Sequence, residues 1–148
     1  MNPLVGNQQG FSMLETMIAA LVVAIGLVGY AQLMNTNLKN TDSAYYRNQA
    51  SILVTEMFDR MRTNVTAANN GEYDIAYATA TPSAVAGNRV VTDLHEWRSS
   101  VERVFPAGTS SVSCVAATSA CTVSVRWDDS RATNGADDQA FTVTSLVR

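Results

Sequence analysis

The chain has 148 residues, of which 47% are apolar and 16% charged, and its formal net charge is −3. This length fits one small domain, and 10 basic against 13 acidic residues give no basic surface of the kind that nucleic-acid binding needs. One histidine and two cysteines are too few for an ordinary catalytic constellation or a zinc site. We therefore expect no enzyme, no cofactor and no nucleic-acid partner.

The amino-terminal part of the chain contains a long uncharged segment. Residues 16–38 carry no charged side chain, and their centre is almost wholly apolar. A helix of about 20 apolar residues spans a bilayer core, so this segment can cross a membrane. It differs from a cleaved secretory signal in three ways. Residues 1–10 lack Lys and Arg, and the apolar run is longer than in such a signal. The small residue that could mark a cleavage site, Gly10, lies before the apolar run and not after it.

The most informative motif directly precedes this segment and reads Gly10-Phe11-Ser12-Met13-Leu14-Glu15. It resembles the class III signal of type IV prepilins and type II secretion pseudopilins. In that family a membrane peptidase cuts after the glycine and methylates the new terminus. The resemblance implies a leader over residues 1–10, cleavage between Gly10 and Phe11, and N-methylation of Phe11. The leader departs from the family pattern in having no basic residue, and a positive-inside count alone would place the amino end outside the cytoplasm.

Glu15 is a carboxylate at the edge of the spanning helix, where a charge costs a few kcal/mol and indicates a functional site. After cleavage, the amine of Phe11 and the helix dipole would compensate part of this charge. The same amine on a neighbouring subunit could attract Glu15 by about 4 kcal/mol at about 4 Å and a dielectric of about 20, before desolvation. We predict that Glu15 sets the register between subunits; the alternative is an interfacial acid that reaches the headgroups.

The apolar helix is expected to continue into polar sequence, because no Pro or Gly occurs between Gly29 and Gly71. Apolar residues recur there at spacings of three and four, which predicts one buried stripe: Tyr46, Ala50, Leu53, Met57 and Met61. We expect one helix over residues 11–64, with residues 11–34 in the membrane or filament core and the rest packed against a sheet.

A surface connection and a second helix are expected next. Residues 65–91 are rich in small and polar residues, and only three positions alternate as in a short strand: Tyr73, Ile75 and Tyr77. From Asp93 to Phe105 the apolar residues return to helical spacing. We expect Asp93 to cap this helix, with Glu96 reaching back to it, and His95 to lie on its solvated side.

The carboxyl-terminal part of the chain indicates β structure. Alternation over Thr122–Trp127 places three apolar residues on one face, and Ala140–Val147 repeats the pattern more loosely. The segment Asp128–Asp138 lacks the regular spacing of a calcium loop, so we expect a solvated hairpin loop and no metal. The predicted class is α+β: a pilin-like fold with a long amino-terminal helix packed on a small antiparallel sheet in a head of residues 65–148.

Cys114 and Cys121 flank a possible earlier hairpin. If its turn centres between Ala117 and Thr118, the cysteines lie opposite each other, within the Cα separation that a disulfide accepts. An exported head would meet an oxidising periplasm, where closing this loop adds about 2.5 kcal/mol of stability in the chain-entropy model. The competing interpretation, two buried free thiols, suits a cytosolic protein.

Further short stretches are similar to minor pilins of the PilV type: Asp59–Asn64 with Gly71-Glu72-Tyr73, Trp97 to Gly108, and Val123–Trp127. This resemblance implies a role in priming and assembling the type IV pilus, in a tip complex. The implied partners are minor and major pilins, the prepilin peptidase, the inner membrane and the pilus assembly platform, with a periplasmic head before assembly. Two alternatives remain: a pseudopilin of a type II secretion system, and a membrane-anchored periplasmic enzyme or binding protein.

Overall fold

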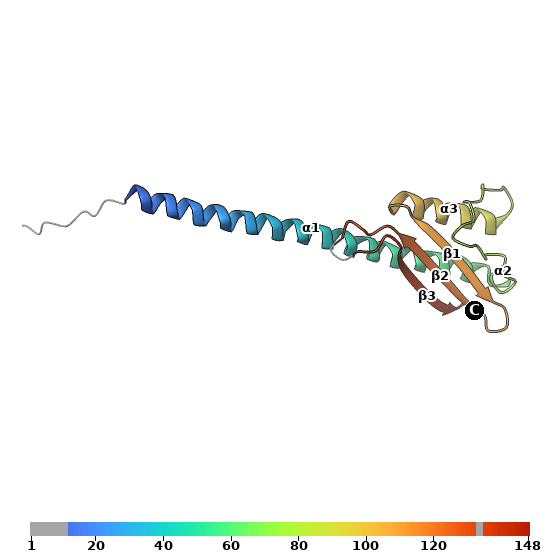
Figure 1. Ribbon diagram of the computed structural model, residues 1–148. Coiled ribbons are helices and arrows are strands. Elements are labelled where there is room, and N and C mark those ends of the chain that lie inside the picture. The colour runs from blue at the N-terminus through green and yellow to red at the C-terminus, as the bar shows by residue number, and fades with distance from the viewer. Residues whose placement is uncertain (1–11, 133–134) are drawn as a thin grey trace, which may run out of the picture. The chain divides into compact units, whose positions relative to one another are not determined.

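The structure is a computed structural model that describes residues 12–132 and 135–148. Helix α1 spans Met13–Thr63, α2 spans Val65–Asn69 and α3 spans Arg89–Val104 (Figure 1). The chain divides into an amino-terminal unit that ends at Leu38 and a head unit that begins at Lys39. Helix α1 therefore contributes residues to both units.

The head contains a three-stranded antiparallel sheet in the order β1-β2-β3. Strand β1 spans Thr109–Val115, β2 spans Ala120–Trp127 and β3 spans Gln139–Leu146. A long helix with an apolar stretch and a small antiparallel sheet confirm the predicted α+β class.

In the amino-terminal unit, α1 exposes apolar side chains on all sides. Met13 is 86% exposed, and Val23 and Leu38 are each more than half exposed. A helix that is apolar all round belongs in a large core or a membrane. By length and composition, α1 is the one helix in the described part of the chain that could cross a membrane.

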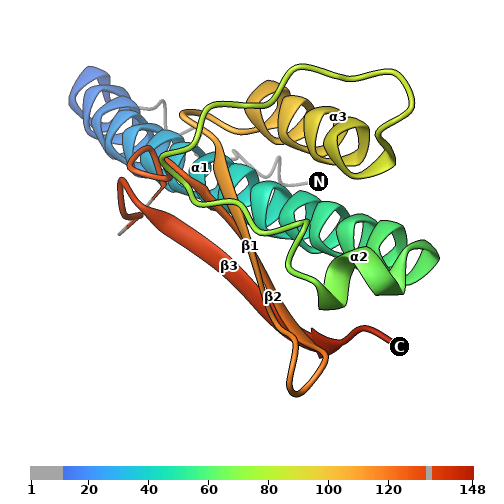
Figure 2. The ribbon, with the colours of Figure 1, turned by 90° about the vertical axis from the view of Figure 1, so that its right-hand side faces the viewer.

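In the head unit, α1 and α3 lie on the same side of the sheet (Figure 2). The predicted stripe is buried from Ala50 to Met61, while Tyr46 is half-buried beside the core. Helix α3 and the sheet complete the core with their own fully buried side chains, Trp97, Val101, Val123, Val125 and Trp127. The Trp97 indole Nε1 also donates a hydrogen bond of 2.8 Å to the Leu53 carbonyl oxygen, so α3 is tied to α1 by a polar contact inside the core.

The strand predictions are confirmed in register as well as in position. Cys114 lies opposite Cys121 in the β1–β2 ladder. Val123, Val125 and Trp127 share one face of β2 and are at most 1% exposed. The alternation of apolar and polar residues was sufficient to predict these strands because one face of the sheet is buried against helices.

The connection after α1 is more ordered than predicted. It begins with the short helix α2, and Tyr73 and Ile75 then enter the core, at 0% and 8% exposure. Ile75 and Val112 exchange two backbone hydrogen bonds of 2.9 Å. Ile75 thus pairs with β1, and the side chains of Tyr73 and Ile75 gain burial that a surface loop would not provide.

The prediction that Asp93 caps α3 was wrong. The cap is Asn88, whose side-chain oxygen accepts a hydrogen bond of 3.1 Å from the Val91 N–H. Asp93 lies inside the helix and is 2% exposed. Its carboxylate is held there by Arg60 of α1, by Tyr73 of the connection after α2 and by Arg89 of α3 itself.

Two further residues predicted to be solvated make tertiary contacts. His95 is half-buried, and its Nδ1 lies 2.7 Å from the Pro82 carbonyl oxygen. In the predicted solvated loop, Asp129 is 5% exposed and accepts a hydrogen bond of 2.6 Å from the Ser43 hydroxyl of α1. Part of this loop is therefore anchored to the helix.

Candidate functional site

The start of α1 is organised by Ser12. Its side-chain oxygen accepts a hydrogen bond of 3.2 Å from the Leu14 N–H, and its carbonyl oxygen accepts one of 3.0 Å from the Glu15 N–H. These contacts satisfy backbone donors that a helix leaves free at its amino end. Gly10 and Phe11, the predicted processing residues, lie outside the described residues.

Glu15 lies in the first turn of α1 with an exposed side chain. Its negative charge is favoured there by the positive end of the helix dipole. No hydrogen bond or ion pair joins its carboxylate to another residue between Ser12 and Arg148 that the structure describes. The carboxylate is thus presented on an otherwise apolar surface.

The head contains a cluster of charged residues around Asp93, which we call the Asp93 cluster. Arg60 of α1 donates to Asp93 at 3.1 Å, and Arg89 donates to both Asp93 oxygens at 3.0 and 3.1 Å. The Tyr73 hydroxyl donates to Asp93 Oδ2 at 2.9 Å. One buried carboxylate therefore joins α1, α3 and the connection between them.

The outer members of the Asp93 cluster are more exposed. Arg60 also bonds Glu56 and Glu96, each at 2.8 Å, and the side chains of these two acids are 41% and 55% exposed. Burial alone would lower the pKa of the Arg60 guanidinium, but hydrogen bonds to Glu96, Glu56 and Asp93 raise it above its ordinary value. Arg60 stays charged and can balance the buried acid.

Burial raises the pKa of the Tyr73 phenol to about 12, and the hydrogen bond to Asp93 adds to the effect. Both causes act in the same direction, because the phenolate would be desolvated and would lie beside a carboxylate. Tyr73 therefore serves as a hydrogen-bond donor to Asp93. Its fully buried position indicates a structural role rather than one at a surface site.

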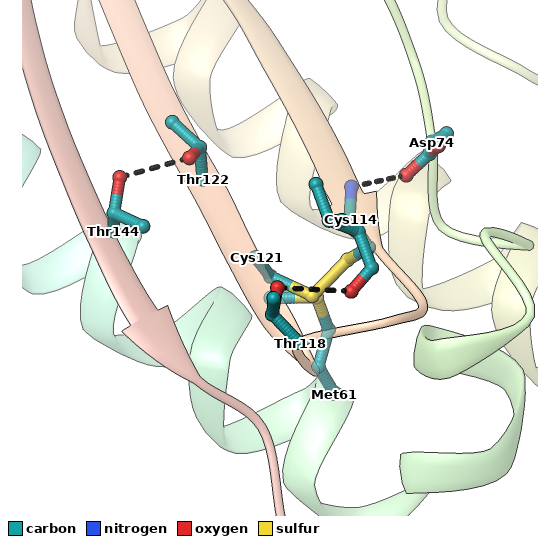
Figure 3. The surroundings of a disulfide bond; sticks show 8 residues. Met61, Asp74, Cys114, Thr118, Cys121, Thr122 and Thr144 are labelled. Atoms are coloured by element: carbon teal, nitrogen blue, oxygen red, sulfur yellow. Dashed lines mark hydrogen bonds between the residues drawn. A yellow bond between two sulfur atoms is a disulfide. The ribbon is translucent and has the colours of Figure 1, made fainter.

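A disulfide joins Cys114 and Cys121 across the β1–β2 hairpin, with a Cα–Cα distance of 4.0 Å (Figure 3). The Met61 sulfur of α1 lies 4.0 Å from Cys114 Sγ. Asp74 Oδ1 accepts a hydrogen bond of 2.7 Å from the Cys114 N–H. The disulfide thus lies where the hairpin meets α1 and the connection that follows α2.

Comparison with known proteins gives one match, over residues 6–31, to the prokaryotic N-terminal methylation motif. The chain carries this methylation motif. The match spans Gly10, Phe11 and Glu15, together with the first apolar turns of α1. No curated protein and no solved structure shows significant similarity to the chain.

The methylation motif supports a type IV pilin or pseudopilin, a family of structural rather than enzymatic proteins. The motif implies processing by a prepilin peptidase and assembly with other pilins. Together with the apolar half of α1, it is consistent with membrane anchoring. Within residues 12–132 and 135–148, no group of three or more His, Cys, Asp or Glu side chains could hold a metal ion.

Sequence reasoning missed the Asp93 cluster. Arg89 and Asp93 have opposite charges and lie four residues apart, a spacing that predicts neighbours on one helix face. This pair could have moved the predicted start of α3 from Asp93 towards Asn88. Nothing local indicates that Arg60, 33 residues earlier, reaches the same carboxylate. That contact depends on how the two helices pack.

Proposed function

We propose that this protein is a minor pilin of the PilV type, which takes part in priming and assembling the type IV pilus within a tip complex of minor pilins. The methylation motif over residues 6–31, which includes the start of a helix apolar and long enough to cross a membrane, is the observation that carries this proposal. In this proposal, residues 1–10 are the leader and residues 11–34 lie in the membrane and later in the filament core. Residues 65–148 form the head domain, which together with residues 39–64 makes up the head unit.

Each predicted site residue has a role in this proposal. Gly10 and Phe11 are recognised by the prepilin peptidase, and Phe11 becomes the methylated terminus. Glu15 pairs with the terminal amine of a neighbouring subunit and sets their register. The apolar side chains exposed on α1 support such bundling, since in a lipid or helix-bundle environment a lone carboxylate gains most from a cationic partner. The Cys114–Cys121 disulfide stabilises the exported head.

The mature amino terminus tests this proposal most directly. Mass spectrometry of the protein purified from its native host should identify Phe11 as the first residue, with one added methyl group. A terminus at Met1, or at a residue beyond Tyr30, would contradict a pilin-type function. It would instead favour a membrane-anchored periplasmic enzyme or binding protein.

A pseudopilin of a type II secretion system is the second candidate, because the same motif occurs in that class. Deletion of the gene separates the two candidates. Loss of surface pili with normal protein export is expected for the minor pilin, and the opposite phenotype would assign the protein to secretion.

A further inference from the structure

The two edges of the head sheet differ in how they are covered. On the outer side of β1, Val112 exchanges two hydrogen bonds with Ile75. The Cys114 N–H of the same strand donates to the Asp74 carboxylate. Part of the β1 edge is therefore occupied by the connection that follows α2.

Strand β3 forms the opposite edge, and no strand in the described part of the chain pairs with its outer side. The strand Gln139–Leu146 contains neither a charged residue nor a proline, which are common means of protecting an edge. The outward-facing backbone groups of β3 pair with no other strand of this sheet and therefore form a template for an added strand.

The side chains of β3 are also left half-covered on this edge. On the face towards the core, Phe141 and Val143 lie opposite Val125 and Val123 of β2, yet both are only partly buried. A strand added at the edge would cover them from the other side. Burial of this apolar surface would add to the backbone hydrogen bonds.

The other face of β3 is already held in place by hydroxyl groups. The Thr142 hydroxyl lies 2.6 Å from that of Ser124, and the Thr144 hydroxyl lies 2.8 Å from that of Thr122. These side chains bond to β2 within the sheet. The edge is thus held in an extended form before any partner arrives, which lowers the entropic cost of strand addition.

The charge next to β3 indicates which residue type an added strand would place beside the start of β3. Asp137 and Asp138 directly precede the strand, and both are exposed. In an antiparallel pair, the carboxyl end of the added strand lies beside this start. A basic residue at that end would meet the two carboxylates.

We propose that the β3 edge accepts an extended strand from a neighbouring subunit, antiparallel to β3, with apolar residues beside Phe141 and Val143 and a basic residue facing Asp138. That the occupant is another pilus subunit rests on the proposed function. The edge itself is defined by the sheet alone.

The test uses the full chain in detergent micelles and two synthetic peptides of the length of β3, 8 residues. Both alternate Val and Thr; one has Arg at its carboxyl end and the other at its amino end. The first peptide should slow amide hydrogen exchange in residues 139–146 and bind more tightly than the second. Absence of protection there, or tighter binding of the second peptide, would overturn the proposal.

A charge reversal sharpens the test without altering the core. Asp138→Lys should weaken binding of the peptide with carboxyl-terminal Arg by about two- to fivefold, and should strengthen binding of a matched peptide ending in Asp. The control Asp59→Lys, on the exposed side of α1, should change neither. Equal effects of the two variants would refute the assigned partner charge. Neither assay depends on the identity of the mature amino terminus, so failure here would leave the proposed function standing.

Discussion

At the residue scale, Asp93 shows how a buried charge is accommodated in this small head. The carboxylate is removed from water, which would be costly for a lone ion. Arg60, Arg89 and Tyr73 together supply donors to both of its oxygens. The acid thereby gains the pairing and hydrogen bonding that a buried charge requires.

Tyr73→Phe should lower the free energy of unfolding at neutral pH by about 1.5 to 3 kcal/mol, because a hydrogen bond to a charged acceptor is lost. In the folded protein the pKa of Tyr73 is raised from 10 to about 12. Its stabilising effect is therefore complete below pH 10 and is lost as the pH rises through 12. Chemical denaturation between pH 7 and 12 should show a shallower alkaline loss in the variant.

Tyr45→Phe provides the control for this prediction, since Tyr45 is 54% exposed. Its stability curve should follow that of the wild type. If Tyr73→Phe also followed the wild type across this pH range, the hydrogen bond to Asp93 would have no energetic importance.

Glu15→Ala should reduce incorporation of the protein into pili while leaving removal of the leader largely intact. Glu15 lies downstream of the proposed scissile bond, so its carboxylate is expected to act during assembly. Immunoblots of sheared pili and of membranes measure the two steps separately. Glu72→Ala, which removes an exposed acid of the head, should affect neither. Loss of cleavage in the Glu15 variant would assign this residue to peptidase recognition instead.

At the scale of elements, the β1–β2 hairpin is held by local geometry and by its contact with α1. Its turn places Cys114 and Cys121 in register, and Cys121 is fully buried. The disulfide therefore joins two strands that already pair. Its main effect is on the unfolded chain, whose freedom it restricts.

The double variant Cys114→Ser and Cys121→Ser should lower the free energy of unfolding by about 2.5 kcal/mol, the chain-entropy value for this short loop. Urea denaturation of the oxidised wild type and of the variant measures the difference. Wild-type protein under reducing conditions should lose a similar amount. Equal stability of oxidised and reduced wild type would show that the disulfide does not stabilise the head.

At the scale of the whole molecule, α1 combines two different kinds of surface in one helix. Up to Leu38 its apolar side chains are exposed, whereas from Ala50 to Met61 an apolar stripe is buried in the head core. The first part needs lipid or other helices to cover it. The apolar stripe of the second part is already covered by the head core.

A fragment of residues 39–148 should therefore fold in water without detergent and unfold in a single cooperative transition. The head unit contains its own core, disulfide and Asp93 cluster. Near-ultraviolet circular dichroism during thermal unfolding would detect the packed Trp97 and Trp127. A fragment with helical signal but no fixed aromatic signal would show that the core depends on residues before Lys39.

The amino-terminal motif, the spanning segment, the helical stripe and the hairpin register were all predictable from the amino acids. Each depends on a local pattern. These patterns are the residue order around Gly10, an uncharged run, apolar residues two apart in a strand, and apolar residues three to four apart in a helix. Such patterns do not depend on long-range contacts, because backbone geometry alone decides which side chains share a face of a helix or strand. The match over residues 6–31 rests on the same kind of local information.

The partners of Asp93, the anchoring of Asp129 by Ser43 and the open edge at β3 emerged only from the packed structure. Arg60 and Asp93 are 33 residues apart, and Ser43 and Asp129 are 86 apart. No spacing rule selects such pairs, because their distance depends on how helices and sheet pack together. From its sequence context alone, a polar residue is assigned to a helix cap or to solvent. Tertiary packing can bring it a partner that makes its burial favourable.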